Sequence, residues 1–181
     1  MTRMALVATV ITTATLTLGY LAFGLLTSLI FTAGFLGGLL LWLVFPDRGS
    51  WPALRWPYWI ALGLFVLHRV EEKHFGFFSM LQSVTGVQTP DPFSAAVLAL
   101  LLLSVGGWLL VPWLMRRGHP LGRYFAWTFL ASMGITELAH WLVFPFLEGP
   151  RYVPGMWSVV LLAPVAWWGM RRMVRAGTPT R

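Results

Sequence analysis

The sequence lacks cysteine altogether and has few charged residues, which make up only 10% of the chain. Without cysteine it can form no disulfide, no thiolate metal site and no cysteine nucleophile. Acidic residues are especially scarce, with 6 Asp and Glu against 13 Lys and Arg. The remainder is 57% hydrophobic, which lies outside the usual range of soluble domains. The composition therefore predicts an integral membrane protein, and 181 residues are enough for a single transmembrane domain.

The apolar segments predict an all-α fold, a polytopic membrane bundle of six transmembrane helices. A helix needs about 20 apolar residues to cross the hydrocarbon core, and the uncharged stretch from Met4 to Pro46 is long enough for two. Because this stretch far exceeds the core of a signal peptide, we expect it to remain in the mature protein. A tight turn near residues 24–28 would join its two helices. The predicted spans are 4–24, 27–46, 57–80, 92–115, 122–146 and 152–170, and most are separated by segments that contain Gly and Pro.

The positions of the basic residues agree with six spans and predict their orientation. Arg and Lys concentrate in short cytoplasmic loops. One side of the predicted bundle carries most of the Arg, whereas the other carries only Arg151. We therefore predict that both termini are cytoplasmic, and we expect a lipid bilayer rather than a nucleic acid as the partner. The basic residues on the cytoplasmic side are Arg3, Arg48, Arg55, Arg116, Arg117, Arg123, Arg171, Arg172, Arg175 and Arg181.

The third predicted helix is unusual because it carries six ionisable side chains in the seven residues HRVEEKH, from His68 to His74. A charged group near the centre of a bilayer costs a few kcal/mol, so this segment must face the interior of the bundle. At about 100° per residue, His68, Glu71 and Glu72 gather on one side of the helix. Arg69 falls on the adjacent side, within reach of Glu72.

A second polar pair lies on the fifth predicted helix. Glu137 and His140 are one helical turn apart, as are Glu71 and His74. Counted from the predicted helix starts at about 1.5 Å per residue, Glu71 and Glu137 both lie roughly 20 Å from the cytoplasmic edge. The two helices also run in the same direction. We therefore predict that their polar residues form a single site.

His and Glu are ligands of zinc and of di-iron or di-manganese centres. We predict a divalent metal ion held by His68, Glu71, Glu137 and His140, with Glu72 as the catalytic acid or base and a further candidate ligand. His74 would be an outer partner or an additional ligand. One alternative is purely structural: Arg69 and Lys73 would neutralise Glu72 and Glu137 as ion pairs between helices.

At HRVEE the sequence resembles the HXXEE-motif membrane proteins, and the segment YVPG, from Tyr152 to Gly155, resembles their Tyr-x-Pro-Gly element. The resemblance runs from about His68 to Val160. It implies a bacterial membrane protein, placed in the cytoplasmic membrane, in which the His and both Glu of the motif are candidate metal ligands. His140 matches a His that precedes the Tyr-x-Pro-Gly element. The family pattern has an amide residue four positions before that His, where this chain has Thr136.

Three functions are compatible with such a site. The first is a metal-dependent membrane enzyme acting on a lipid or another apolar small molecule. The second is a metal-free isomerase or cyclase, in which a buried Glu protonates an alkene and aromatic rings stabilise the cation. The third is a proton- or ion-coupled transporter or binding protein. Six spans are few for a carrier, so this third function would call for a homo-oligomer.

Overall fold

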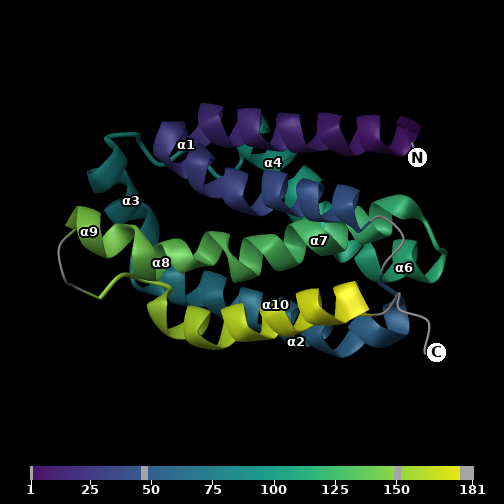
Figure 1. The fold of residues 1–181 in the computed structure, drawn as a ribbon. Coiled ribbons are helices and arrows are strands. Elements are labelled where there is room, and N and C mark those ends of the chain that lie inside the picture. Colours follow the sequence, from purple (N-terminus) through teal and green to yellow (C-terminus); the bar gives the residue numbers. More distant parts are fainter. Residues whose placement is uncertain (1, 46–48, 149–151, 176–181) are drawn as a thin grey trace.

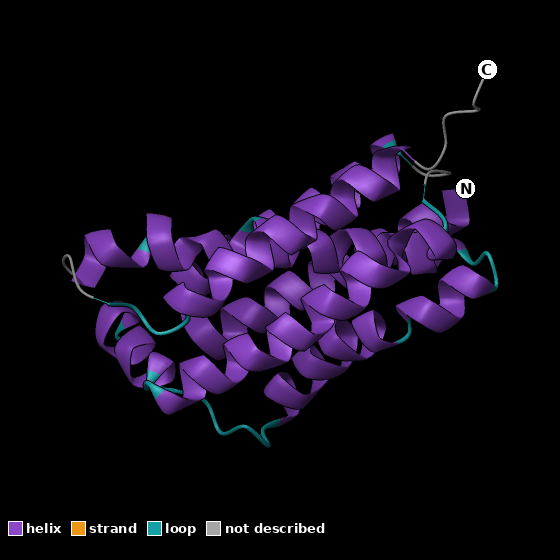
Figure 2. Ribbon diagram, turned by 90° about the horizontal axis from the view of Figure 1, so that it is seen from below, coloured by secondary structure: helices purple, strands orange, loops and turns teal. Residues whose placement is uncertain are grey.

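The computed structural model describes residues 2–45, 49–148 and 152–175, and the regular structure throughout this part of the chain is helical (Figures 1 and 2). The predicted all-α class is confirmed. Arg48, Arg151 and Arg181 lie outside the described residues. The elements are α1 (Thr2–Val44), α2 (Trp51–His74), α3 (Phe77–Thr85), α4 (Ala95–Leu101), the π-helical turn η1 (Leu102–Gly106), α5 (Gly107–Leu109), α6 (Val111–Arg116), α7 (Pro120–Gly134), the 3-10 turn η2 (Thr136–Leu138), α8 (Ala139–Leu142), α9 (Phe144–Glu148) and α10 (Met156–Arg175).

Element α1 is a helical hairpin whose two legs run antiparallel (Figure 1). The chain reverses at Gly24, where φ is 80° and ψ is −176°, a conformation that glycine adopts without steric cost. The legs contact each other beside this turn. The Phe23 and Phe31 ring centroids are 6.4 Å apart, and Ser28 Oγ donates a hydrogen bond to the carbonyl of Leu16. The reversal lies where the sequence predicts the first turn.

The second leg of α1 packs closely against α7, because two glycines four residues apart face that helix. A Cβ at Gly38 would lie 2.5 Å from the Cα of Thr128, and a Cβ at Gly34 would lie 2.9 Å from the Cα of Ser132. Small residues at this spacing let two helix backbones approach closely in membrane proteins. The contact fixes α7, and with it the start of the segment that carries Glu137 and His140.

An aromatic core joins α2 to α5 and α7. The ring of Phe129 packs 4.9 Å from Tyr58 and 5.4 Å from Trp108, and Phe65 packs edge-on against Trp108 at 5.7 Å. The Tyr58 hydroxyl donates to the Trp108 carbonyl at 2.5 Å. Because α2 is held rigidly at Phe65, the next turn of the same helix presents His68 at a defined position.

Two of the predicted spans are not continuous helices. In place of a helix over 57–80, α2 ends at His74 and α3 starts at Phe77, because Gly76 between them is left-handed with φ of 75°. In place of a helix over 122–146, the backbone leaves helical geometry at Ile135, where φ is −127°. The carbonyl of Gly134 instead accepts a 2.7 Å hydrogen bond from Trp167 Nε1. A buried break is tolerated when its freed groups find such partners.

Two helical stretches in the described part of the chain are long and apolar enough to cross a membrane, namely Arg3–Val44 and Pro120–Leu147. This criterion rests on length and composition alone, and the first stretch is folded back on itself at Gly24. The coarse membrane character that the sequence predicts is therefore supported by these two segments.

We expect Gly38→Ala to lower the free energy of unfolding by about 1–3 kcal/mol, because its methyl group would push α1 away from the α7 backbone. Gly37→Ala is the matched control, since a Cβ there meets nothing within 4 Å. That variant should be neutral or gain up to about 1 kcal/mol from better helix propensity. Thermal unfolding of both variants in detergent is the measurement, and equal melting temperatures would contradict this packing.

Candidate metal centre

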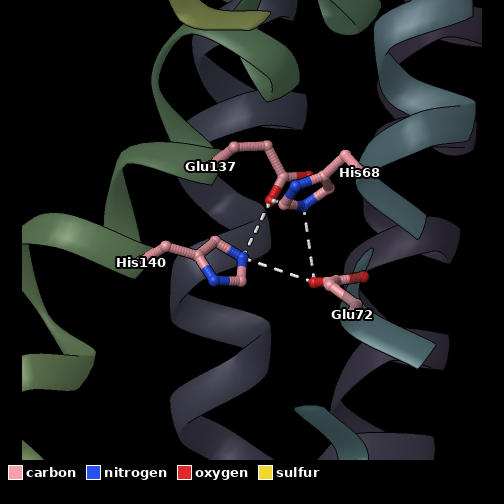
Figure 3. Close-up of side chains that lie close together, drawn as sticks. All are labelled: His68, Glu72, Glu137 and His140. Carbon is pink, nitrogen blue, oxygen red and sulfur yellow. Dashed lines mark hydrogen bonds and ion pairs between the residues drawn. The ribbon is translucent and has the colours of Figure 1, made fainter. Parts of the chain in front are cut away.

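Four buried side chains from two parts of the chain converge at one point (Figure 3). His68 and Glu72 lie one turn apart on α2, and they face Glu137 in η2 and His140 in α8. Each is at most 8% exposed. One donor atom from each residue lies within 4.8 Å of the donor atoms of the other three. The predicted convergence of these residues on one level of the bundle is present in the structure.

Four of the six separations between these donors have the length found between ligands of one metal ion, and all six are within 4.8 Å. Zinc with ligands at about 2.0–2.1 Å in a tetrahedron has edges of about 3.3 Å between ligand atoms. Four edges of that size are present, all between an imidazole Nε2 and a carboxylate oxygen. His68 lies 3.4 Å from Glu72 and 3.1 Å from Glu137, whereas His140 lies 3.3 Å from Glu72 and 3.4 Å from Glu137. The four donors thus surround a point that suits a small divalent cation.

Arg69 binds the outer oxygens of both carboxylates. Its Nη1 is 2.8 Å from Glu72 Oε2, and its Nη2 is 3.1 Å from Glu137 Oε1. Each carboxylate therefore gives one oxygen to the guanidinium and turns the other toward the imidazoles. The sequence predicts that Arg69 reaches Glu72; in the structure it also binds Glu137 and so holds both acids in place. These contacts are the ion pairs of the structural alternative, whereas Lys73 is exposed.

The polar atoms of the cluster are incompletely satisfied by the described residues. Neither oxygen of Glu72 makes a hydrogen bond of regular geometry within that part of the chain, although both lie at ion-pair distances, and His140 Nδ1 also has no partner there. A buried carboxylate without good hydrogen bonds is costly. A cation between the two imidazoles and the two acids would offset this cost, so the residues present fit a divalent metal.

Ser158 sets the orientation of the His68 ring. Its hydroxyl donates to the carbonyl of Gly155 at 3.1 Å and lies 2.8 Å from His68 Nδ1. Since a serine hydroxyl has a single proton, it must accept the second bond from Nδ1–H. The lone pair of Nε2 then faces Glu72 and Glu137, which is the tautomer that binds metal. Nothing in the sequence pattern singled out Ser158.

Gly155 lets the backbone approach both imidazoles. A Cβ at this position would lie 2.6 Å from His140 Cε1 and 2.8 Å from His68 Cε1. Its φ of 102° also belongs to the region that favours glycine. The final glycine of YVPG therefore lies against both histidine rings, and a Cβ at this position would clash with them.

Glu71 does not join the cluster, contrary to our expectation. Its carboxylate accepts hydrogen bonds from the Tyr152 hydroxyl at 2.6 Å and from the backbone N–H groups of Gly155, Trp157 and Ser158 at 3.1, 3.1 and 2.8 Å. The first N–H groups of a helix have no partner inside it, and the helix dipole favours an anion there. Glu71 from α2 therefore caps the start of α10.

His74 also lies apart from the four converging residues. It is the last residue of α2, it is exposed, and its ring packs edge-on against Phe75 at 4.8 Å. The helix ends there because the chain turns at Gly76. The structure thus brings together four of the six residues predicted as ligands and leaves Glu71 and His74 outside the cluster.

A cavity of about 310 Å³ lies against the cluster. Arg69, Glu72, Glu137 and His140 contribute to one wall. The remainder of the wall is largely apolar and rich in aromatic rings. A small molecule in this cavity would lie against Glu72, Glu137 and His140. Aromatic residues in the wall are Phe23, Phe31, Phe35, Phe65, Phe77, Phe78, Trp108 and Phe144.

Comparison with known proteins identifies the family. The family model described as a protein of unknown function with HXXEE motif matches residues 59–169, which is more than half of the chain. No curated protein and no solved structure matches the chain. The chain therefore belongs to the HXXEE-motif family, as the two sequence elements predict.

We expect Glu71→Gln to lower the free energy of unfolding by about 1–3 kcal/mol, because the amide NH₂ would face a backbone donor of α10 in place of a charged acceptor. Denaturant unfolding in detergent measures this loss. His74→Ala, three residues further along the same helix and exposed, should leave stability unchanged. If both variants unfold like the wild type, Glu71 does not hold the start of α10.

Proposed function

We propose that this HXXEE-motif protein is a membrane-embedded enzyme that uses a divalent metal ion to act on a lipid or another apolar small molecule. The observation that carries the proposal is a group of four buried side chains that could hold a metal ion, three of which line an apolar cavity. A site of this kind, concave and mostly apolar with a few convergent polar groups, is the usual form of a small-molecule active site.

Charge balance supports a metal in this centre. Two carboxylates and one guanidinium leave the cluster with one negative charge when both histidines are neutral. A divalent ion held by these residues would change this sum to one positive charge, and an anionic group of the substrate or from water would bring it to zero. A neutral sum is favoured because net charge is costly in an apolar interior.

The residues divide between binding and proton transfer. His68, Glu137 and His140 are our candidate ligands, a set of two His and one carboxylate like that of some catalytic zinc sites. When bound, the ion would polarise a substrate oxygen or activate a water molecule. Glu72 lines the cavity and lacks regular hydrogen bonds within the described residues, so it is our candidate for accepting and returning a proton.

A second candidate, a metal-free isomerase or cyclase, is favoured by one specific contact. The pairing of Arg69 with both acids leaves a single negative charge, which one protonated imidazole would cancel without any ion. In that case Glu72 or His140 would protonate the substrate at the cavity wall. The metal content of the protein distinguishes this candidate from the first.

The arrangement of the helices supports six membrane passes with both termini in the cytoplasm. The passes would be the two legs of α1, then α2, the run α4 to α6, the run α7 to α9, and α10. The start of α1, the end of α10 and α6 lie at the same end of the bundle (Figure 1). That end carries Arg3, Arg116 and Arg175, in agreement with the positive-inside rule. The family resemblance favours a bacterial cytoplasmic membrane.

We expect the purified protein to contain about one equivalent of zinc, iron or manganese, or two equivalents if the centre is a di-metal site. His68→Ala and His140→Ala should each lower this content more than about tenfold, because each removes a ligand. His74→Ala is the matched control, an exposed His on the same helix, and should keep the wild-type content. Elemental analysis by mass spectrometry is the measurement. A folded wild-type protein without stoichiometric metal would contradict the metal centre and favour the acid–base alternative.

The absence of cysteine makes the topology directly testable with single-cysteine variants. A cysteine in place of Arg117, after α6, should react with an impermeant maleimide only when the cytoplasmic side is exposed. A cysteine in place of Gln88, after α3, should react in intact cells. Both positions are exposed in the structure. Labelling of both from the same side would rule out this topology.

A further inference from the structure

Thr27 differs from Thr12 and Thr15, the other threonines of α1 that are buried in the described structure. Thr15 and Thr32 each donate their hydroxyl to the carbonyl four residues earlier, at 2.9 Å. Thr27 is only 6% exposed, yet its Oγ1 has no hydrogen-bond partner among the residues that the structure describes. The carbonyl four residues earlier belongs to Phe23, and the helix is broken between them at Gly24. The usual local partner of a helical threonine is therefore out of position.

Thr27, which carries the unpartnered hydroxyl, is one of the residues that line the cavity beside the candidate metal centre. Thr27 enters the wall from α1, whereas Glu72 enters it from α2 and His140 from α8. Aromatic and aliphatic side chains make up most of the wall. The cavity thus has polar groups on separate elements in largely apolar surroundings. A wholly apolar occupant would leave the hydroxyl buried and unpaired, which is unfavourable.

The cavity volume limits the size of the occupant. An apolar cavity of about 150 Å³ holds one benzene molecule, and this cavity of 310 Å³ is about twice as large. It would therefore hold roughly a dozen non-hydrogen atoms by the same measure. A whole phospholipid is far larger than this, so the cavity suits a small apolar molecule or the terminal part of a longer chain.

We propose that the cavity binds an apolar molecule, or apolar segment, of roughly a dozen non-hydrogen atoms that carries two oxygen functions. One oxygen function meets Glu72, Glu137 and His140 at the metal centre, and the other forms a hydrogen bond with Thr27 Oγ1. This substrate class rests on the proposed function for the first contact only, because the contact with Thr27 does not depend on a metal.

Pairs of ligands that differ by one hydroxyl test the proposal. Alkane-α,ω-diols of six to twelve carbons and the 1-alkanols of equal length are titrated into the full-length protein in lipid nanodiscs, with empty nanodiscs as the reference. Calorimetry gives the ratio of the two dissociation constants at each length. For at least one length, we expect Thr27→Val to raise the dissociation constant of the diol relative to that of the alkanol by about tenfold or more. The reason is that a site built around a hydroxyl discriminates strongly against its loss.

Two matched variants complete the test. Thr27→Ser keeps the hydroxyl and should keep the wild-type ratio. Thr15→Val removes a hydroxyl that already bonds its own helix and should also leave the ratio unchanged. The inference is overturned if Thr27→Val has the wild-type ratio at every length, or if no diol in the series binds.

The metal content of each variant separates this inference from the proposed function. Thr27→Val should retain the metal of the wild type, because it touches none of the candidate ligands. If the purified protein contains no metal but the ratio of dissociation constants depends on Thr27, the contact with Thr27 is retained and the metal centre is rejected. If the protein contains stoichiometric metal but the ratio is the same in Thr27→Val as in the wild type, only the contact with Thr27 is rejected.

Discussion

The ion pairs that Arg69 makes with Glu72 and Glu137 are the interaction around which the centre is built. Two carboxylates in an apolar interior repel each other and lose their hydration, so they stay together only if cations compensate them. Arg69 supplies one charge and binds the oxygens that face away from the imidazoles. What remains is a pair of oxygens directed at two histidines, with one charge still to be balanced. A bound cation or a proton shared among these groups would supply that balance, so the geometry is compatible with either.

The HRVEE string and the YVPG segment, which identify the family, are parts of one hydrogen-bonded unit. Glu71 caps the first turn of α10, and this fixes the backbone of Gly155 and Ser158. Ser158 then orients His68, and Gly155 lies against both histidine rings. Glu71 and Glu72, although adjacent in the sequence, therefore have different roles. Glu72 faces the cavity, whereas Glu71 holds α10 in the position that presents the His68 tautomer able to bind metal.

Reasoning from helix direction and depth was sufficient to predict that His68 and Glu72 would meet Glu137 and His140, because both quantities follow from residue counting. The same reasoning failed for Glu71, whose carboxylate binds the unpaired N–H groups at the start of α10. These groups can be identified only once the fold is known. His74 was misassigned because the left-handed conformation at Gly76 ends α2. The close approach of α1 to α7 does have a signal in the sequence, the pair Gly34 and Gly38, which reasoning based on charge and length overlooked.

The irregular parts of the helices gather around the cavity. Phe23 precedes the reversal at Gly24, Phe77 follows the break at Gly76, Thr136 follows the distorted Ile135, and Ser104 lies in the π-helical turn; all four line the cavity. Regular helices pack closely along their length, and each break interrupts that packing at the same level of the bundle. Irregular backbone inside a membrane is tolerated where it is buried in protein or borders a cavity, and π-helical turns are frequent at functional sites. The breaks at Gly76 and Ile135 and the π-helical turn, which the apolar pattern did not predict, thus border the cavity together with the predicted reversal at Gly24.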